Sequence, residues 1–230
     1  MTETKWAPDS SAARLQDTRA SYDTVAEDYA ELLCDELSHK PFDRAMLAAF
    51  ADRVLARGGG PVAELGCGPG RVTAHLHRLG LDVFGVDLSP EMIRVARRDH
   101  PVLRFEVGDM TALDLEDASV AGVCAWYSTV HTPPEELPRL FTEFHRVLAP
   151  GGTMLLAFKA GALRRNLTHA YGHDLSLEVH WARPELVERV LAQAGLTVEA
   201  QLVREPDGQE RGPQGYVLAH RLPEEARPRR

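Results

Sequence analysis

Apolar positions follow two different spacings along the chain, and the change divides it into two regions. Residues 13–57 place Val25, Tyr29 and Leu32 on one face of a helix, so this region is expected to form a helical cap. Residues 58–222 instead alternate short apolar runs with amphipathic segments. This alternation predicts an α/β core in which strands and helices follow one another.

The apolar runs of the core predict seven strands. They lie at residues 61–65, 81–86, 102–107, 119–126, 153–158, 196–203 and 216–220. Helices separate most of them, and the last two are joined without one. The expected fold is therefore a Rossmann-like, doubly wound sheet of mostly parallel strands with an antiparallel last strand. In such sheets, ligands bind beyond the carboxyl ends of the strands.

Two segments between the predicted strands stand out by their residue types. Thr132-Pro133-Pro134-Glu135 has the spacing of a capping box, which predicts that a helix begins there. Residues 160–181 show no regular period and contain three histidines, Tyr171 and Trp181. Because a long irregular segment in a compact domain is usually functional, we expect this one to contribute to a site.

Length and charge narrow the class of protein. The chain has 230 residues and a net charge of -8, with no long basic block. One domain is expected, and a nucleic-acid substrate is disfavoured. The longest apolar stretch, residues 118–126, is too short for a membrane helix, and the N-terminus lacks the pattern of a signal peptide. A cytoplasmic protein without a membrane partner is therefore expected, as a monomer or a homodimer.

Cysteine spacing and terminal composition add two further expectations. Cys34, Cys67 and Cys124 are too scattered for a disulfide framework or a zinc site, so no metal is expected. Residues 1–12 and 223–230 are polar and are expected to be mobile tails.

A glycine-rich turn follows the first predicted strand, in the sequence V-A-E-L-G-C-G-P-G at residues 62–70. Because glycine has no side chain, Gly66, Gly68 and Gly70 can adopt positive φ and let a ligand approach the backbone. A dinucleotide fingerprint would place another glycine at position 71, where this chain has Arg71. The turn therefore favours a ligand without a pyrophosphate.

Acidic residues stand at the ends of three successive strands. Glu64 can meet or order the surroundings of an ammonium group, and Asp87 is placed to accept hydrogen bonds from ribose hydroxyls. Asp109 can accept from an exocyclic amine, and a flat ring could be sandwiched by Met110, Leu88 and Met92. This set fits a cationic ligand that carries adenosine.

The motifs E-L-G-C-G-P-G, V-D-L-S-P-x-M, G-D-M and L-x-P-G-G together resemble the class I S-adenosylmethionine-dependent methyltransferases, in particular bacterial families that act on small molecules. The resemblance covers about residues 20–220 and implies a seven-stranded sheet with a reversed last strand. It further implies methyl transfer from the cofactor S-adenosylmethionine to an O or N atom of a small-molecule acceptor, with S-adenosylhomocysteine as product.

The resemblance also implies how the cofactor is held. The glycine loop and Glu64 would hold its methionine part, Asp87 its ribose, and Asp109 with Met110 its adenine. The segment Y-D-T-V-A-E-D-Y resembles the family's cap, in which tyrosines at positions like Tyr22 and Tyr29 close over the cofactor. Their spacing of seven residues places both on one helical face, so core packing explains it equally well. The expected cofactor-binding residues are Tyr22, Tyr29, Glu64, Gly66, Cys67, Gly68, Gly70, Arg71, Asp87, Leu88, Met92, Asp109, Met110 and Ala125.

The acceptor side is less sharply predicted. His131, just after the strand at 119–126, is the first candidate for a general base, because histidine suits proton transfer from a hydroxyl near neutral pH. His169, His173 and His180 are the other candidates. The expected acceptor-pocket residues, for which core packing is the alternative, are Trp126, Tyr127, Tyr171, His173 and Trp181.

Two other functions remain open at this point. The fold does not fix an activity, so the chain could bind S-adenosylmethionine for regulation or scaffolding without catalysis. A weaker alternative is an NAD-dependent oxidoreductase, which the residue at position 71 disfavours.

Overall fold

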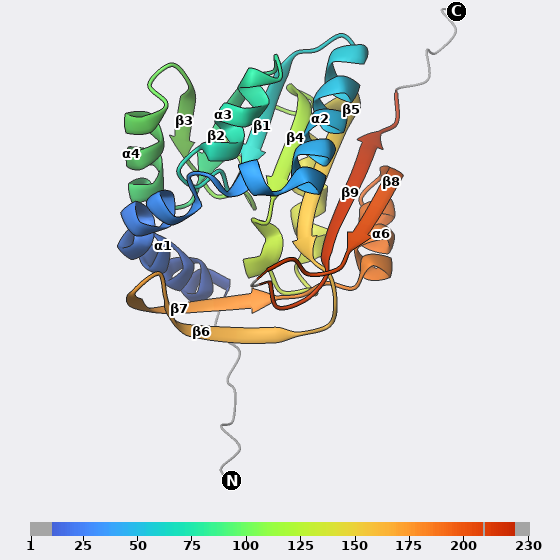
Figure 1. The fold of residues 1–230 in the computed structure, drawn as a ribbon. Coiled ribbons are helices and arrows are strands. Elements are labelled where there is room, and N and C mark those ends of the chain that lie inside the picture. The colour runs from blue at the N-terminus through green and yellow to red at the C-terminus, as the bar shows by residue number, and fades with distance from the viewer. Residues whose placement is uncertain (1–10, 209, 224–230) are drawn as a thin grey trace, which may run out of the picture.

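The computed structural model describes residues 11–208 and 210–223, and a central sheet with helices on both faces organises it (Figure 1). The sheet has the strand order β3-β2-β1-β4-β5-β9-β8. Its strands are β1 (Pro61–Leu65), β2 (Asp82–Asp87), β3 (Arg104–Val107), β4 (Val120–Trp126), β5 (Leu148–Lys159), β8 (Leu196–Arg204) and β9 (Gln214–Arg221). The predicted Rossmann-like α/β fold is confirmed.

The last strand, β9, inserts between β5 and β8. It runs antiparallel to both neighbours, whereas β3, β2, β1, β4 and β5 are parallel. The sequence indicated only one antiparallel pair. The insertion produces two, because a reversed strand inside a sheet must oppose the strand on each side.

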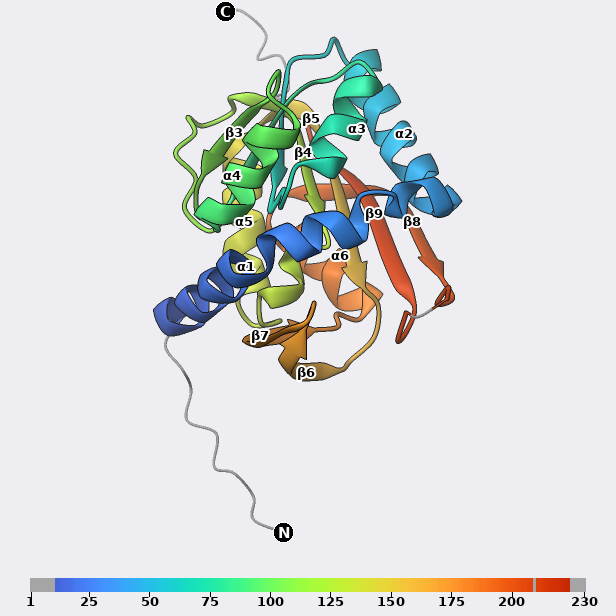
Figure 2. The same ribbon diagram turned by 60° about the vertical axis from the view of Figure 1, so that its left-hand side comes forward.

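Helices cover both faces of the sheet (Figure 2). They are α1 (Ser11–Leu33), α2 (Pro41–Ala56), α3 (Arg71–Arg78), α4 (Pro90–Asp99), α5 (Leu137–Val147) and α6 (Pro184–Gln193), with the short 3-10 helices η1 (Glu36–His39) and η2 (Thr129–His131). Phe50 of α2 and Leu76 of α3 belong to the core on one face, and Phe141 of α5 and Leu191 of α6 to the core on the other. The apolar stripe of each helix therefore faces the sheet.

The first helix begins earlier than expected. Helix α1 starts at Ser11, inside the segment that we expected to be a tail. The rest of both expected tails, residues 1–10 and 224–230, lies outside the described residues. In the described ranges 11–208 and 210–223, no helix is long and apolar enough to cross a membrane.

The segment 160–181 is a β-hairpin, so our prediction of an irregular segment was wrong. Strands β6 (Arg164–Ala170) and β7 (His173–His180) form a separate antiparallel sheet. Tyr171 and Gly172 join them with φ of 53° and 83°, as a two-residue hairpin turn with two positive φ angles requires. The sequence hides this hairpin because Tyr-Gly is a weak turn signal and β6 exposes polar residues on both faces.

The capping box predicted at residues 132–135 was also wrong. Helix α5 begins at Leu137, and Thr132 is extended, with φ of -94° and ψ of 121°. Because a residue before proline avoids the helical region, Pro133 and Pro134 delay the helix. The delay leaves room for η2, which carries His131.

Candidate functional site

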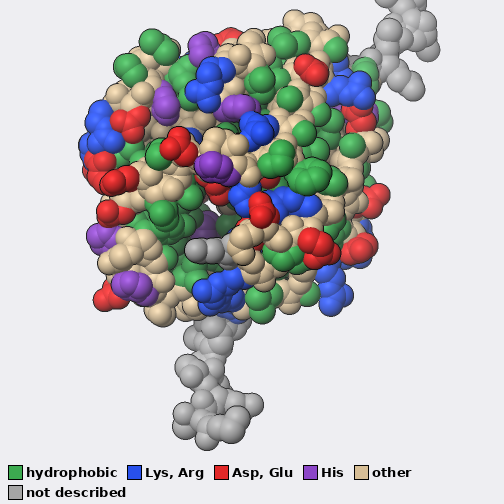
Figure 3. Space-filling view, viewed as in Figure 1, with side chains coloured by type: hydrophobic (Ala, Val, Ile, Leu, Met, Phe, Trp, Pro, Cys, Tyr) green, Lys and Arg blue, Asp and Glu red, His purple; other side chains and the backbone are tan. Residues whose placement is uncertain are grey.

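A cavity opens beyond the carboxyl ends of β1 to β4, beneath α1. Figure 3 shows a hollow near the middle of the molecule, with hydrophobic side chains on one side and charged side chains on the other. Thirteen of the site residues predicted from the sequence line the cavity: Tyr22, Tyr29, Gly66, Gly68, Arg71, Asp87, Leu88, Met92, Asp109, Met110, Trp126, Tyr127 and His131.

The turn between β1 and α3 requires its glycines. Gly66, Gly68 and Gly70 have φ of 74°, 54° and 82°, a region that side chains strongly disfavour. A Cβ on Gly66 would lie 2.3 Å from Cβ of Ser128, which follows β4. The backbones of the two strand-end loops can therefore approach each other only with glycine at position 66.

Asp87, at the end of β2, is fixed by backbone donors. Its Oδ2 accepts from Gly68 N–H at 2.8 Å, and its Oδ1 accepts from Ser89 N–H at 2.9 Å. Burial raises the pKa of this carboxyl, and the two backbone hydrogen bonds lower it. Each oxygen keeps a second lone pair, so Asp87 can still accept from a ligand.

Asp109 follows β3, and one of its two carboxylate oxygens already accepts hydrogen bonds within the protein. Its Oδ1 accepts from both the backbone N–H and the hydroxyl of Thr111, each at 2.8 Å. This local turn fixes the direction of the carboxylate and leaves Oδ2 available to a ligand donor.

Glu64 lies under the glycine loop rather than in the cavity wall. It is 1% exposed and accepts a hydrogen bond from the Thr73 hydroxyl of α3. Burial raises its pKa to about 8, so the carboxyl is mostly protonated at neutral pH in the ligand-free protein. Glu64 can therefore order the loop, but in this structure it offers no group to the cavity surface.

Three further predicted residues, Cys67, Gly70 and Ala125, also lie outside the cavity lining. The Cys67 thiol is buried against α4 and β3, and burial raises its pKa well above the ordinary value. Gly70 packs against Phe105, and Ala125 belongs to the core beneath the sheet. These three residues pack on the side of the loops that faces away from the cavity.

A hydrogen-bonded chain joins α1, η2 and β7 at the cavity. The Tyr22 hydroxyl lies 2.7 Å from Nε2 of His131, and Nδ1 of His131 lies 2.7 Å from the backbone oxygen of Glu178. Burial lowers the pKa of His131 to about 4 and outweighs the hydrogen bond to the Glu178 backbone, which raises it. His131 is therefore neutral at pH 7.

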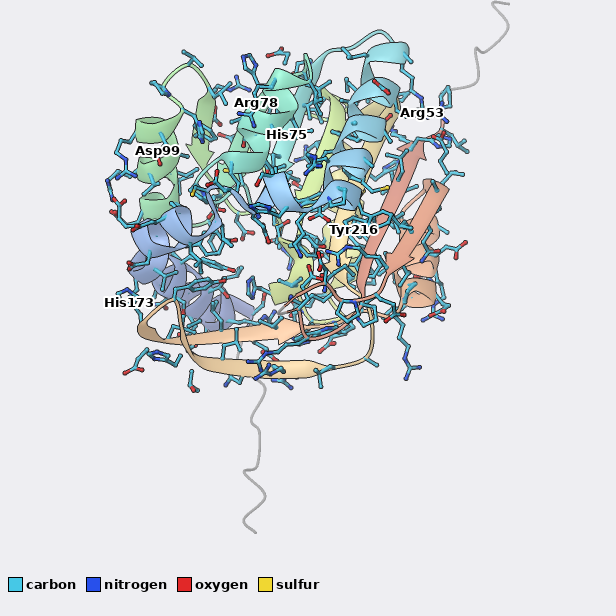
Figure 4. The ribbon with its side chains drawn as sticks, in the orientation of Figure 1. Arg53, His75, Arg78, Asp99, His173 and Tyr216 are labelled. Atoms are coloured by element: carbon cyan, nitrogen blue, oxygen red, sulfur yellow. The ribbon has the colours of Figure 1, made fainter. Side chains whose placement is uncertain are left out.

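The other predicted acceptor residues support the cavity from outside. The Tyr171 ring packs edge-on against the Tyr29 ring, with centroids 5.1 Å apart. His173 contacts Asp28 of α1 at 2.6 Å, and Figure 4 shows it at the end of the hairpin beside that helix. Trp181 packs with Val130 behind η2. The three residues hold the hairpin against α1 and η2 and do not reach the cavity surface.

Tyr127 forms part of the cavity wall and is unusual in its backbone. Its φ is 54°, in the left-handed region that a bulky residue rarely adopts. Its hydroxyl donates to Tyr216 at 3.1 Å, and the Tyr216 hydroxyl donates to Asp43 at 2.5 Å. Figure 4 shows Tyr216 on β9 near α2. Buried partners from two distant elements thus hold the turn after β4.

Sequence reasoning missed cavity residues on the first turns of α1. Arg14, Leu15 and Thr18 line the cavity together with Tyr22 and Tyr29. Their spacing of three and four residues is the available signal, because it continues the face that carries both tyrosines. The Arg14 contact with Glu136, before α5, joins segments too distant in sequence to be predicted.

Three buried polar atoms of the cavity residues have no hydrogen-bond partner among the residues that the structure describes. They are Nη1 of Arg71, Nε1 of Trp126 and Oγ of Ser128. Nη2 of Arg71, in contrast, pairs with Glu36 of η1 at 2.6 Å. Because an unpaired buried polar group is costly, these atoms indicate a polar ligand. The described ranges contain no group of three or more His, Cys, Asp or Glu side chains that could hold a metal ion.

Comparison with known proteins agrees with this geometry. Residues 62–152, from β1 to the start of β5, match the family model described as a methyltransferase domain. Over these residues the chain is similar to the methyltransferase domain of class I S-adenosylmethionine-dependent methyltransferases. The matched residues supply the glycine loop, Asp87, Asp109 and His131, whereas α1 and the β6–β7 hairpin lie outside the match.

Individual relatives extend the comparison. The chain is 33% identical over 117 residues to a malonyl-[acyl-carrier protein] O-methyltransferase of Pectobacterium atrosepticum, covering 50% of this chain and 45% of the relative. It is 33% identical over 141 residues to a demethylmenaquinone methyltransferase of Beutenbergia cavernae, covering 61% and 57%. The chain thus spans about half the length of these curated relatives.

One solved structure matches nearly the whole chain. It is the Burkholderia thailandensis 1,6-didemethyltoxoflavin-N1-methyltransferase with bound 1,6-didemethyltoxoflavin and S-adenosylhomocysteine. The TM-score is 0.69 at 23% identity, and the match covers 96% of this chain and 93% of that chain. At this identity the likeness establishes the fold.

Proposed function

We propose that the chain transfers the methyl group of S-adenosylmethionine to an oxygen or nitrogen atom of a small molecule. The observation that carries this proposal is one cavity with two kinds of wall. Strand-end acids and a glycine loop line one wall, and aromatic rings with a neutral His131 line the other. The named activities of the relatives, which methylate small or carrier-bound molecules, support the same class of reaction.

The unpaired polar atoms of the cavity fit this cofactor. Nη1 of Arg71 needs an anionic or polar partner, and the cofactor carries one carboxylate. We assign Arg71, with the backbone of Gly66 and Gly68, to the methionine part. Glu64 acts on this part indirectly, through the loop above it.

We assign the adenosine part of the cofactor to Asp87 and Asp109, which follow β2 and β3. Asp87 has a free lone pair on each oxygen for the ribose hydroxyls, and Oδ2 of Asp109 is open to the adenine amine. Leu88, Met92 and Met110 supply apolar surface for the flat ring. In this assignment α1 and α2 form the cap, and residues 58–222 form the methyltransferase core.

S-adenosylmethionine supplies a methyl group that its sulfonium already activates, so the chain's own task is to align the acceptor and exclude water. Trp126 and Tyr127 supply rigid apolar walls for the acceptor. His131 holds an open lone pair on Nε2, because it is neutral and its Nδ1 is bonded to the Glu178 carbonyl. His131 is therefore our candidate for the proton acceptor.

The test has two steps. Calorimetry first measures S-adenosylhomocysteine and NAD against the same protein, and we expect binding of the former alone. Mass spectrometry then searches a panel of small molecules, incubated with S-adenosylmethionine, for a product that has gained one methyl group. Failure to bind S-adenosylhomocysteine would contradict the proposal, and binding without product across the panel would favour a regulatory or scaffolding role.

A further inference from the structure

We propose that the acceptor is a phenol or enol, and that its acidic hydroxyl passes its proton through Tyr22 to His131. This inference rests on the proposed methyl transfer and narrows it to O-methylation of one class of hydroxyl. The geometry of the chain from Tyr22 to Glu178 carries it.

The direction of each hydrogen bond in this chain is fixed. A backbone carbonyl only accepts, so the proton of the neutral imidazole lies on Nδ1 and points to the Glu178 oxygen, 2.7 Å away. Nε2 then carries a lone pair, and the Tyr22 hydroxyl, also 2.7 Å away, must donate to it. The proton of Tyr22 already points at the group that would receive it.

Tyr22 can also receive a proton from the cavity. Tyr22 and His131 are each only partly buried, and both line the cavity. The Tyr22 oxygen donates one hydrogen bond and keeps lone pairs for a ligand hydroxyl. An acceptor hydroxyl that donates to this oxygen extends the chain by one link, which makes Tyr22 the group that touches the substrate.

The proposed proton and methyl transfers conserve atoms, electrons and charge. The acceptor proton moves to Tyr22 as the Tyr22 proton moves to Nε2 of His131. The electron pair left on the acceptor oxygen forms the new bond to the methyl carbon, and the pair of the broken carbon–sulfur bond stays on sulfur. One positive charge leaves the sulfonium and one appears on the imidazole, so the net charge of the cavity is unchanged.

Electrostatics restricts the acceptor to an acidic hydroxyl. Burial, together with Tyr29, Tyr171 and Asp87, raises the pKa of Tyr22 well above its usual value, so Tyr22 stays protonated at rest. The lowered pKa of His131 makes it a weak base. A weak base assists an acceptor that gives up its proton readily, as phenols and enols do, and is poorly matched to an aliphatic alcohol.

The cavity wall suits a flat ring with a second oxygen. The Trp126 and Tyr127 rings meet edge to face with centroids 5.6 Å apart, an arrangement that leaves planar surface for an aromatic or conjugated acceptor. In the described part of the chain, the buried Nε1 of Trp126 has no partner, and an indole nitrogen can only donate. A carbonyl or hydroxyl oxygen on the acceptor would satisfy it.

The test compares phenols of one to three fused rings with the arylamines, benzylic alcohols and carboxylic acids of the same ring systems. Mass spectrometry detects methylated products, and calorimetry measures the binding of each probe to the protein saturated with S-adenosylhomocysteine. We expect O-methylation of a phenol, and about tenfold tighter binding of that phenol than of its matched amine, the value of one hydrogen bond.

The variant Tyr22→Phe keeps the ring and removes the hydroxyl. We expect about a 100-fold loss of kcat with the phenol, as for other proton-transfer groups, and loss of its binding preference. A nitrophenol of the same ring is already ionised near neutral pH, so the variant should methylate it at close to the wild-type rate. Thr24→Ala, which removes an exposed hydroxyl from the same helix, should change none of these values.

The outcomes distinguish a failure of the proposed methyl transfer from a failure of the proposed acceptor class. If S-adenosylhomocysteine does not bind, the proposed methyltransferase function fails. If it binds but phenols are neither methylated nor preferred over their matched amines, the acceptor class is overturned and the function stands. If Tyr22→Phe slows the phenol and the nitrophenol equally, Tyr22 has a structural role and the proton path is wrong.

Discussion

The two walls of the cavity differ in how the chain builds them. Loops that directly follow β1, β2 and β3 form one wall, and hydrogen bonds between neighbouring strand-end loops, such as Gly68 N–H to Asp87, hold it. Helix α1 and residues 126–131, supported by the β6–β7 hairpin, form the other, and contacts between distant segments hold it. Strand-end loops are placed by the sheet itself, whereas the second wall exists only when α1 and the hairpin dock. We therefore expect the first wall to bind the cofactor and the second to select the acceptor.

Helix α1 is held on its two sides by side-chain hydrogen bonds to α4 and to β7. Asp23 of α1 accepts from the Ser89 hydroxyl at 2.6 Å and from the Glu91 N–H at 3.2 Å. It thereby adds acceptors at the N-terminus of α4, next to Asp87. On its other side, α1 meets β7 through Ser21, whose hydroxyl exchanges hydrogen bonds with the backbone of Ser176.

The largest effect is expected from Gly66→Ala. Its Cβ would lie 2.3 Å from Ser128 in a left-handed backbone, so we expect loss of cofactor binding and a fall in unfolding free energy of about 3 kcal/mol. The control is Gly151→Ala, where φ is 79° but no described atom lies within 4 Å. Gly151→Ala should lower the free energy of unfolding by only about 1 kcal/mol. Calorimetry and denaturant unfolding measure both, and equal behaviour of the two variants would contradict the account.

A smaller effect on the same wall is expected from Asp87→Asn. The amide keeps the shape but turns one acceptor oxygen into a donor that faces a backbone N–H. We expect cofactor affinity to fall about 100-fold, the value of two charged hydrogen bonds of about 1.5 kcal/mol each. Asp82→Asn, at the exposed start of the same strand, is the matched control. If Asp87→Asn leaves the cofactor affinity unchanged, the Asp87 carboxylate does not contribute to cofactor binding.

Loosening the second wall should act on the acceptor instead. Ser21→Ala removes both hydrogen bonds to Ser176, at 3.0 and 3.1 Å, and should cost about 1 kcal/mol of stability. We expect the acceptor KM to rise about fivefold while cofactor affinity stays within about twofold. Thr24→Ala on the same helix again serves as control. A fall in cofactor affinity with no change in acceptor KM would reverse our assignment of the walls.

A separate prediction concerns how the stability of the protein depends on pH. The pKa of Glu64 is raised from 4.5 to about 8, so the folded protein holds a proton that the unfolded chain releases. The stability that this proton contributes is complete below about pH 4.5 and is lost as pH rises toward 8, at about 1.4 kcal/mol per pKa unit. Glu64→Gln should flatten this slope in thermal melts between pH 5 and 8. A slope as steep as that of the wild type would show that other groups cause it.

The sequence predicted the first wall because its signals are local. Glycine at alternate positions followed by Arg71, and an acid at each strand end, are patterns that a parallel sheet brings together by its topology. Glu64 shows the limit of this reasoning, because strand position gave its proximity to the loop but not the direction of its side chain.

The second wall could not be predicted in the same way. Nothing in the sequence pairs Tyr22 with His131 or His131 with the Glu178 backbone, because these contacts depend on how the hairpin docks. The hairpin itself was missed although Leu175, Leu177 and Val179 alternate with polar residues in β7, because its turn is Tyr171-Gly172 and β6 exposes polar residues on both faces. The tertiary bonds that hold Tyr127 through Tyr216 and Asp43 have no local signal at all.

A crystal structure with S-adenosylhomocysteine and a methylatable phenol would test the central claim most directly. The account predicts ribose hydroxyls on Asp87, the adenine amine on Asp109, and the phenol oxygen within hydrogen-bond distance of Tyr22, facing the sulfur. A cofactor bound away from Asp87, or a phenol that leaves Tyr22 and His131 untouched, would contradict it.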